Sequence, residues 1–316
     1  MRIVSLLASG TEIVCALGLA DQLVAISHEC DYPATILDRP RVSRPRFDPM
    51  GLSSGAIDSE LRRVMAEHGS AYAVDEDQLR AVRPDLILTQ DVCEVCAVPT
   101  TLAEQAVRAI GRPVEILSLD AHDIHGILHS VRRVADAAGA GEAGIDVVSG
   151  LRRRLEMVAT RVAPASRPRV MVLEWLDPPF IPGHWGPEMV DLAGGENVAG
   201  QAGKRSKQAT WDQLKGLDPD VLLVAPCGYG LPEAKADADR FAAQLASVAP
   251  RAIAEGRAWV ADGSAYFNRS GPRVADGVEI LGAIVHPDRF PDVDLSGRAA
   301  HWTPATSPAG GAARYI

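Results

Sequence analysis

The sequence predicts an α/β protein with two doubly wound parallel-sheet lobes joined by a single long rigid helix. Short apolar segments alternate with helical ones along the 316 residues, which is typical of parallel sheets with right-handed crossovers. In addition, residues 77–88 resemble residues 212–223, with six of twelve positions identical. Each copy indicates a helix end, a Pro-Asp break and an apolar strand. Two copies this far apart indicate two related lobes rather than a solenoid.

The first lobe is predicted to span residues 1–120. It opens with a strand at Arg2–Leu7, and its Pro-Asp copy leads into a strand at Leu86–Leu88. A Ser-Gly-Thr turn should separate the first strand from a helix at Thr11–Leu17, which ends at a glycine. The remaining elements expected in this lobe are strands at Leu23–Ser27 and Val114–Leu117 and a helix at Thr101–Ile110.

A helical linker is predicted over residues 121–165. Its second half has apolar residues every three or four positions, the spacing of one helix face. These residues are Ile145, Val148, Leu151, Leu155, Val158 and Val162. A helix of about 20 residues is roughly 30 Å long, enough to reach across two lobes. The linker should therefore hold the lobes apart as a rigid rod.

The second lobe is predicted to span residues 166–290. It opens with a strand at Arg169–Glu174, and its Pro-Asp copy leads into a strand at Val221–Val224. A helix at Pro187–Leu192 and a strand at Ala258–Ala261 complete the expected elements. The segment 291–316 is predicted to be a C-terminal tail, loose from Thr303 onward because it is rich in Pro, Ala and Gly.

Composition excludes several classes of protein. Hydrophobic residues make up 47% and charged residues 23%, as in ordinary globular proteins, and no apolar run is long enough to span a bilayer. The net charge of −9 argues against nucleic acid as a partner. Glu12 interrupts the apolar N-terminus, and the five cysteines are an odd number. We therefore expect a monomer in the cytoplasm, with a periplasmic or other extracytoplasmic location as the alternative.

The candidate ligand-binding residues follow the predicted strands, because ligands of open parallel sheets bind beyond the carboxyl ends of the strands. Many of the 15 aromatic side chains lie in these segments, which indicates flat apolar surfaces facing a cleft. No Gly-x-Ser-x-Gly, Walker or His-Glu-x-x-His motif is present, so we predict no catalytic residues. The candidates are Ser9, Thr11, His28, Tyr32, Asp91, Trp175, Asp177, His184, Trp185, Tyr229, Tyr266, Phe267, Asn268 and Arg269.

A second candidate site is a metal centre at the strand ends of the first lobe. Cys93-x-x-Cys96 follows one strand, and His28 and Cys30 follow a neighbouring one. Thiolates and imidazole are good ligands for zinc or iron. Reduced thiols without metal, a disulfide and a catalytic dithiol are the alternatives.

The motifs together resemble the helical-linker (class III) substrate-binding proteins of ABC importers for cobalamin, haem and iron-siderophores. The resemblance rests on the Ser9–Leu17 opening, both Pro-Asp copies, the linker helix, the 191–197 segment and the 271–286 helix region. A narrower resemblance is to the cobalamin-binding protein subgroup related to the vitamin B12-binding protein. It rests on the 27–33 segment, the Cys93-x-x-Cys96 segment, Gly183-His184-Trp185 and the 266–269 segment.

The resemblance implies a periplasmic-binding-protein-like fold and a non-enzymatic protein that holds a corrinoid, cobalamin or a precursor, between its lobes. Aromatic candidates would cover the faces of the ligand, polar ones would hydrogen-bond its amide rim, and His28 or a thiol would reach the cobalt. An ABC importer permease would be the partner. The first alternative is a carrier of a metal or of a haem- or siderophore-type metal complex. The second is a cytosolic dithiol redox enzyme or sensor.

Overall fold

The N-terminal lobe is built on a four-stranded parallel sheet in the order β2-β1-β5-β6. The computed structural model describes residues 1–91 and 98–304. Central strand β1 is fully buried because its two faces pack on different cores: Ile3 joins the cluster with α1 and α5, and Val4 joins the cluster with α3 and α4. The strands are β1 (Ile3–Ser5), β2 (Leu23–Ile26), β5 (Leu86–Thr89) and β6 (Glu115–Ser118), and the helices are α1 (Ala8–Ala16), α3 (Glu76–Val82), α4 (Thr100–Ile110) and α5 (Ile124–Ala137).

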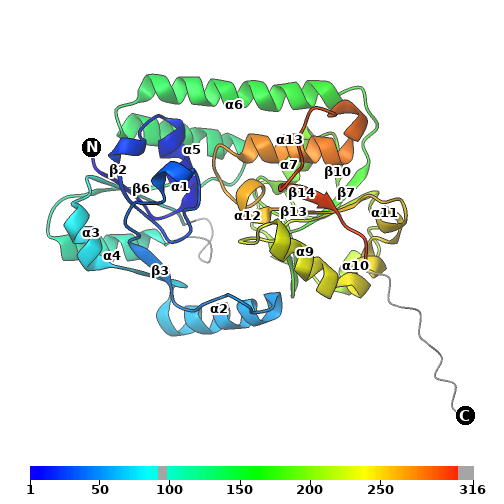
Figure 1. Cartoon of the computed structure of the whole chain (residues 1–316), viewed down its shortest axis with the longest axis horizontal. Coiled ribbons are helices and arrows are strands. Elements are labelled where there is room, and N and C mark those ends of the chain that lie inside the picture. Colours follow the sequence, from blue (N-terminus) through cyan, green and yellow to red (C-terminus); the bar gives the residue numbers. More distant parts are fainter. Residues whose placement is uncertain (92–97, 305–316) are drawn as a thin grey trace, which may run out of the picture.

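The C-terminal lobe repeats this plan with a five-stranded sheet in the order β10-β7-β12-β13-β14. Its first four strands are parallel, and β14 pairs with β13 in the antiparallel direction. The strands are β7 (Arg169–Leu173), β10 (Glu196–Asn197), β12 (Val221–Val224), β13 (Ala258–Ala261) and β14 (Ala299–His301). The predicted α/β architecture with two parallel-sheet lobes is confirmed, and Figure 1 shows the lobes side by side.

The amino ends of the two sheets are held in the same way. The backbone N–H of Arg2 donates to the Asp85 carboxylate at 2.8 Å, and that of Arg169 donates to the Asp220 carboxylate at 2.7 Å. The guanidinium of each arginine also donates to a backbone carbonyl just before the Pro-Asp break. We call each of these arrangements a strand clamp. The sequence repeat therefore corresponds to one structural device that occurs once in each lobe.

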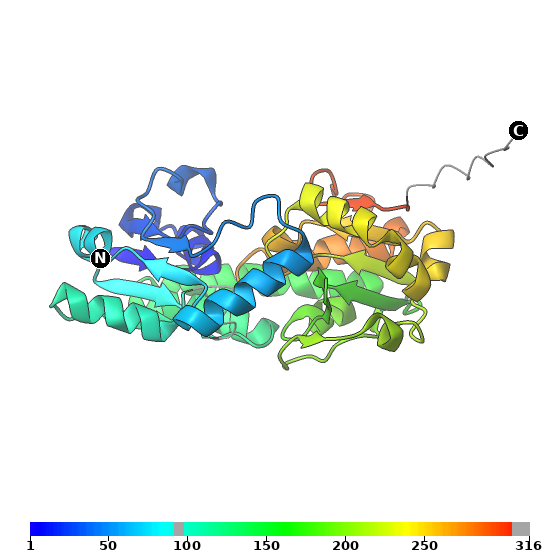
Figure 2. The ribbon, with the colours of Figure 1, turned by 90° about the horizontal axis from the view of Figure 1, so that it is seen from below.

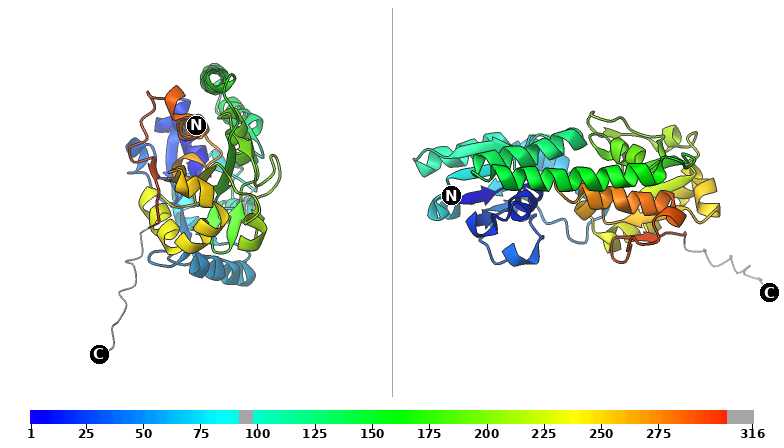
Figure 3. Two further views of the ribbon diagram at one scale, coloured as in Figure 1. Left: turned by 90° about the vertical axis from the view of Figure 1, so that its right-hand side faces the viewer. Right: turned by 90° about the horizontal axis from the view of Figure 1, so that it is seen from above.

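The linker is the 22-residue helix α6 (Gly141–Val162), which follows α5 of the N-terminal lobe. Helix α6 runs along both lobes, packing on α5 and on α13 (Val274–Val285), as Figures 1 and 3 show. The predicted apolar stripe is buried except at Ile145, which is 52% exposed; the buried Gly144 faces Ala135 of α5 in its place. Arg154 adds a bidentate ion pair to Glu279 of α13 at 2.7 and 2.8 Å. The rod is thus fixed to both lobes.

A second connection between the lobes lies on the side opposite α6 and was not predicted. Helix α2 (Ser54–His68) stands between the antiparallel strands β3 (Ser43–Pro45) and β4 (Tyr72–Val74) and reaches from the N-terminal lobe to the C-terminal one. Figure 1 shows it at the bottom of the molecule, and Figure 2, seen from below, shows it in front, running from one lobe toward the other. At its far end the buried Ser54 hydroxyl donates to the Asp237 carboxylate of the C-terminal lobe at 3.1 Å. We call α2 the crossing helix.

Two predicted boundaries differ from the structure. Helix α1 begins at Ala8, where the sequence analysis expected a turn before Thr11. Gly10 makes this early start possible, because a Cβ atom there would lie 2.8 Å from the Ser5 hydroxyl. The predicted tail 291–316 contains β14 and the buried Trp302, so the sheet of the C-terminal lobe continues past residue 290. The divisions at residues 120 and 165 stay predictions.

The other elements are short and mostly cover the C-terminal lobe. They are β8 (Trp175–Leu176), β9 (Pro179–Ile181), β11 (Lys207–Gln208), α7 (Gly186–Leu192), α8 (Trp211–Leu214), α9 (Leu231–Arg240), α10 (Ala242–Val248), α11 (Pro250–Ala254), α12 (Gly263–Tyr266) and three 3-10 turns at Ala20–Gln22, Ala34–Ile36 and Pro287–Arg289. Strands β11, β9 and β8 form a small antiparallel sheet. No helix within the described residues is long and apolar enough to cross a bilayer.

Candidate functional site

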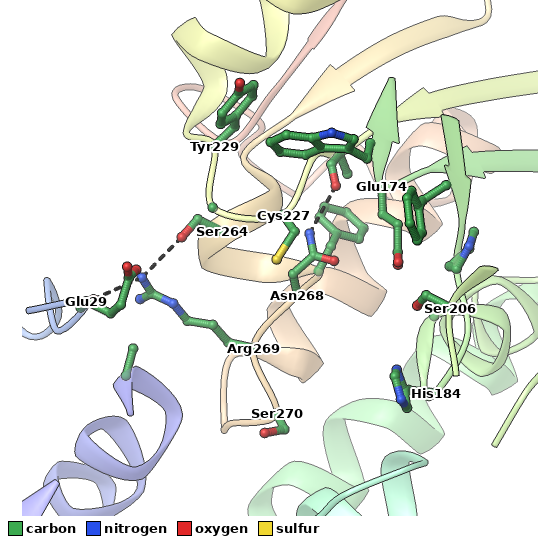
Figure 4. Close-up of a pocket in the computed structure, with 18 of the residues that line it drawn as sticks. Glu29, Glu174, His184, Ser206, Cys227, Tyr229, Ser264, Asn268, Arg269 and Ser270 are labelled. Carbon is green, nitrogen blue, oxygen red and sulfur yellow. Dashed lines mark hydrogen bonds between the residues drawn. The ribbon is translucent and has the colours of Figure 1, made fainter. Parts of the chain in front are cut away.

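A cavity of about 580 Å³ lies between the two lobes, and we call it the cleft. In the C-terminal lobe it sits beyond the carboxyl ends of parallel strands: Glu174 follows β7 and Cys227 follows β12. Figure 4 shows side chains of both lobes around it. Its volume lies in the range of small-molecule sites, about 300–1,000 Å³. Eight of the predicted ligand-binding residues line it, namely Ser9, Trp175, His184, Trp185, Tyr229, Phe267, Asn268 and Arg269.

The C-terminal side of the cleft presents a set of aromatic rings, Trp175, Phe180 and Tyr229, which we call the aromatic wall. The Trp175 and Tyr229 rings are 5.1 Å apart and tilted by 49°. The Trp175 indole N–H donates to the Asp177 carbonyl at 3.0 Å, so the ring is held in place before any ligand arrives. The wall is therefore a preformed surface for a flat apolar molecule.

Deeper in the C-terminal lobe, Trp185 and Phe267 support the cleft. Both side chains are almost buried, and the Trp185 indole N–H donates to the Phe267 carbonyl at 2.8 Å. The Asn268 amide donates to the carbonyls of Ala225 and Gly263, both at 3.0 Å. These bonds use both amide protons, so the Asn268 oxygen is what remains for a ligand.

The N-terminal side of the cleft comes largely from residues that the sequence analysis missed. Phe47, Tyr72 and Leu61 lie on or beside the crossing helix and its flanking strands, and Gln90 follows β5. Leu61 is one of the apolar residues spaced along α2, and this helical periodicity was the available signal. Phe47 sits in a loop and gave no signal of its own.

An ion-pair network closes the interface between the lobes beside the cleft. Glu12 of α1 has a side chain that is only 2% exposed, and it accepts from Arg273 at 2.6 Å and from Arg269 at 3.2 Å. Arg269 also pairs with Asp31 at 2.6 Å. Burial alone would raise the pKa of Asp31, but hydrogen bonds and charge from Arg269 outweigh it and hold that pKa below its usual range. We call these four residues the interlobe network.

Two acidic groups of unusual protonation lie on the C-terminal side of the cleft. Burial raises the pKa of Glu174 to about 7, and a hydrogen bond with Ser206 only partly opposes this. Burial also raises the pKa of the Cys227 thiol to about 12, with a further contribution from the charge of Glu174. Cys227 is thus a neutral thiol at pH 7, and Glu174 is poised between its two forms.

Among the residues that the structure describes, His184 is the histidine that lines the cleft. Its Nε2 atom is buried and has no hydrogen-bond partner, and its ring stacks on His122 at 5.7 Å. Burial, and then the nearby charge of His122, lower the pKa of His184. The imidazole is therefore neutral at pH 7, the form that ligates metals.

Two predicted polar residues of the first lobe make contacts within the fold and do not line the cleft. The Thr11 hydroxyl is buried against the Cys30 thiol at 3.0 Å. The His28 ring nitrogen Nδ1 lies 2.8 Å from the Ser43 hydroxyl, so His28 faces β3. Its neighbour Glu29 lines the cleft instead. In this segment the structure thus places Glu29 at the cleft, and not the predicted His28.

The remaining predicted residues outside the cleft serve other contacts. The Arg273 guanidinium lies 4.5 Å from the centre of the Tyr32 ring and 5.6 Å from that of Tyr266, so both rings flank the interlobe network. Asp177 lies against the crossing helix. The exposed Asp91 carboxylate accepts from the first N–H of α4 at 2.8 Å. None of these four residues lines the cleft.

The predicted metal site cannot be assembled from the described residues. Cys93 and Cys96 lie outside them, and within residues 1–91 and 98–304 no group of three or more potential ligands converges. Cys30 is buried and contacts the hydroxyls of Thr11 and Ser27, and burial raises its pKa. Zinc or iron at this place stays a prediction.

A two-lobed α/β fold with a helical linker and a cleft between the lobes defines a solute-binding protein of the kind that serves ABC importers. The chain belongs to the periplasmic binding protein family, which it matches over residues 3–263. It is a binding protein and not an enzyme, as the relatives and structural neighbours below are.

The curated relatives include vitamin B12-binding proteins. That of Vibrio cholerae is 25% identical over 281 residues, which cover 88% of this chain and 86% of the relative. That of Yersinia pestis is 25% identical over 227 residues, covering 71% of this chain and 69% of the relative. The matched stretches span most of both chains, so the likeness is not confined to one lobe.

Solved structures of two kinds share the fold. The periplasmic vitamin B12 binding protein of Vibrio cholerae has a TM-score of 0.66 at 23% identity, covering 90% of this chain and 96% of that one. A periplasmic heme binding protein from Pseudomonas aeruginosa has a TM-score of 0.67 at 22% identity, covering 93% and 94%. At these identities the likeness shows the fold and does not choose between the two ligands.

The predicted cytoplasmic location is wrong. The family and its relatives are periplasmic binding proteins, which points to an extracytoplasmic location. The prediction relied in part on unpaired cysteines. Cys15, Cys30 and Cys227 are indeed free, but burial raises the pKa of each thiol. Thiols with raised pKa values stay protonated at pH 7 and react slowly, so they do not indicate a reducing compartment.

Proposed function

We propose that the protein binds a corrinoid, cobalamin or one of its precursors, in the cleft and presents it to the permease of an ABC importer. The observation that carries the proposal is the aromatic wall, Trp175, Phe180 and Tyr229, facing a second lobe that supplies Phe47 and Tyr72. A corrinoid is a large, nearly flat macrocycle with an apolar face. The names of the relatives, vitamin B12-binding proteins, support the same ligand class.

The polar rim of a corrinoid carries amides, and the cleft offers partners for them. The Ser9 hydroxyl lies 3.4 Å from that of Ser270, so a polar pair from the two lobes meets there. Gln90 is buried, and the Asn268 amide nitrogen donates both of its hydrogen bonds within the lobe, which leaves its oxygen to accept from a ligand. Neutral hydroxyl and amide groups match an amide rim, because they both donate and accept hydrogen bonds.

A spectroscopic titration tests the proposal. Protein unfolded and refolded to remove any bound molecule is titrated with cyanocobalamin, and retention is measured by ultrafiltration and by the visible spectrum. We expect one molecule retained per chain at micromolar protein. Free passage of cyanocobalamin and of dicyanocobinamide through the membrane would contradict a corrinoid ligand.

The second candidate function is carriage of haem or a related metal complex. It rests on His184, whose neutral imidazole lines the cleft and could ligate iron. In that case haemin would give a Soret shift that His184→Ala abolishes. Under the corrinoid proposal His184→Ala leaves most of the affinity for cyanocobalamin intact, because the cobalt of that molecule is already ligated on both faces.

A further inference from the structure

The charges that line the cleft are mostly already paired with other protein groups. Arg269 is held by Glu12 and Asp31 in the interlobe network. Asp58 pairs with Arg62 at 2.7 Å, and Glu29 lies 3.2 Å from the His28 ring. Among the described lining residues, Arg205 and Glu174 are the charged types for which no ion pair is seen. Among the described lining residues, Arg205 is therefore the cation that a ligand meets without an ion-pair partner.

Glu174 is fixed at the floor of the cleft by its own backbone. Its N–H donates to the Phe180 carbonyl at 3.0 Å, and its carbonyl accepts from the Cys227 N–H at 2.9 Å. The backbone of Glu174 is thus hydrogen-bonded on one side to β9 and on the other to the segment that follows β12. These bonds fix the backbone from which the side chain projects, and Figure 4 shows the side chain directed toward Ser206.

Ser206 occupies only part of the hydrogen-bonding capacity of this carboxyl group. The Ser206 hydroxyl accepts from the Gly183 N–H at 3.0 Å, which leaves its own proton available for the hydrogen bond with Glu174. A carboxyl group has two oxygens, and one serine proton uses a single lone pair. The group keeps both a donor, when protonated, and an acceptor for a molecule in the cleft.

We propose that Glu174 is a specificity-determining residue that, as a neutral carboxylic acid, pairs with a primary amide of the ligand and disfavours ligands that present carboxylates there. The inference rests on the proposed corrinoid function. A carboxylic acid and a primary amide form two complementary hydrogen bonds, O–H to C=O and N–H to C=O. A ligand carboxylate at the same place would face a second acidic group, and two such groups cannot both ionise cheaply.

The surroundings of Glu174 favour its neutral form. From the end of β12 it faces the Cys227 thiol, which is uncharged because its pKa is about 12. From β9 it faces Phe180, and from the 205–206 loop Ser206 with Arg205 beside it. His184 is neutral, and across the cleft stands the carboxylate of Glu29, whose pKa is lowered chiefly by the His28 hydrogen bond. The pKa of Glu174 itself is raised to about 7 by burial.

The sign of the pH dependence follows from this raised pKa. The acid form predominates a unit or more below pH 7, makes up about half of the molecules near pH 7, and is lost as the pH rises further. If only the acid form pairs with the amide, the dissociation constant for cyanocobalamin rises by about tenfold or more between pH 6 and pH 9. Glu174→Gln keeps a neutral donor and acceptor at every pH, so its profile should be flat.

The test is calorimetric titration of cyanocobalamin at pH 6, 7, 8 and 9 into the wild type, Glu174→Gln and Glu29→Gln. We expect a steep profile for the wild type, a flat one for Glu174→Gln, and the wild-type slope for Glu29→Gln, because Glu29 is ionised throughout. At pH 8, replacing cyanocobalamin by dicyanocobyrinic acid, whose side chains are carboxylates, should weaken wild-type binding about tenfold more than that of Glu174→Gln.

The possible outcomes distinguish a failure of the role proposed for Glu174 from a failure of the corrinoid proposal. A wild type that binds cyanocobalamin with the same affinity from pH 6 to pH 9 overturns the role of Glu174 and leaves the corrinoid proposal standing. The same holds if Glu174→Gln keeps the wild-type slope. A wild type that binds no cyanocobalamin at any of the four pH values overturns both. The wild-type profile needs no variant, so it decides the matter even if Glu174→Gln folds poorly.

Discussion

The two lobes are alike at one end of their sheets and different at the other. At the amino ends, both have the strand clamp, and each clamp includes a further arginine: Arg112 pairs with Asp85, and Arg251 with Asp220. At the carboxyl ends, the C-terminal lobe presents the aromatic wall, whereas the N-terminal lobe presents the crossing helix and polar groups. The clamp ends keep a shared framework, and the cleft ends carry what distinguishes one ligand from another.

Removing the interlobe network, which joins the two lobes, should have the largest effect on the stability of the protein. Glu12→Ala leaves two largely buried guanidinium groups without their common carboxylate, so we expect a loss of about 3–5 kcal/mol in the free energy of unfolding. Chemical denaturation followed by tryptophan fluorescence measures it. Asp292→Ala, which removes an exposed pair with Arg161, is the matched control and should cost less than about 1 kcal/mol. Equal losses would mean that Glu12 does not join the lobes.

The aromatic wall should contribute more to binding than the opposite lobe does. Trp175→Ala removes a preformed ring, and we expect about a 30-fold rise in the dissociation constant for cyanocobalamin, near 2 kcal/mol. Phe47→Ala, on the N-terminal side, should cost about fivefold. Trp211→Ala is the control, because Trp211 stacks on Phe241 at 6.1 Å and does not line the cleft. A larger loss for Phe47→Ala than for Trp175→Ala would reverse the assignment of the lobes.

The two strand clamps offer a smaller, paired test. Asp85→Asn and Asp220→Asn should each lower stability by about 1–2 kcal/mol at pH 7, with the greater loss for Asp220, whose side chain is 21% exposed against 42% for Asp85. Arg112 and the Arg2 N–H lower the pKa of Asp85. The carboxylate therefore stabilises the fold above its unfolded pKa of about 3.9, and the advantage disappears as the pH falls through the folded value.

Thermal unfolding between pH 3 and pH 7 measures this pH dependence of the stabilisation by the Asp85 carboxylate. The difference in stability between wild type and Asp85→Asn should narrow below pH 4. A difference that stays constant down to pH 3 would show that the Asp85 charge does not support the clamp.

Ligand binding should change the relative position of the two lobes very little, which makes this the smallest of the expected effects. Helix α6 is fixed to both lobes, the interlobe network joins them beside the cleft, and Ser54 joins them at the crossing helix. Bending α6 would also expose a buried stripe, at roughly 1.5–3 kcal/mol per large apolar side chain. Small-angle scattering with and without cyanocobalamin should show nearly the same radius of gyration. A clear decrease would mean that the rod and the network yield on binding.

Much of the fold was predictable because its signals are local. The Pro-Asp copies, the strands and the stripe of α6 each follow from the identity and spacing of neighbouring residues. The start of α1 was not, because it depends on the close approach of Gly10 to Ser5. The crossing helix has a periodic apolar face and an N-capping Ser53, but its place across the cleft depends on contacts with the other lobe.

The candidate site was predictable on one side only. Residues such as Trp175 and Tyr229 directly follow strands, so the rule for parallel sheets finds them. That rule selects a segment and not the direction of each side chain, which is why Glu29 lines the cleft while His28 faces Ser43. Phe47 and Leu61 come from the crossing helix region, which does not follow a strand of the main sheet.

The central claim is that one ligand lies between the lobes, chiefly against the C-terminal lobe. Hydrogen–deuterium exchange of the protein with and without saturating cyanocobalamin tests it most directly, because backbone protection reports where the ligand lies. We predict the strongest protection at 174–185 and 226–230, weaker protection at the crossing helix, and no change in α10 or α11. Protection confined to segments outside the cleft, or none at all with cyanocobalamin bound, would contradict the account.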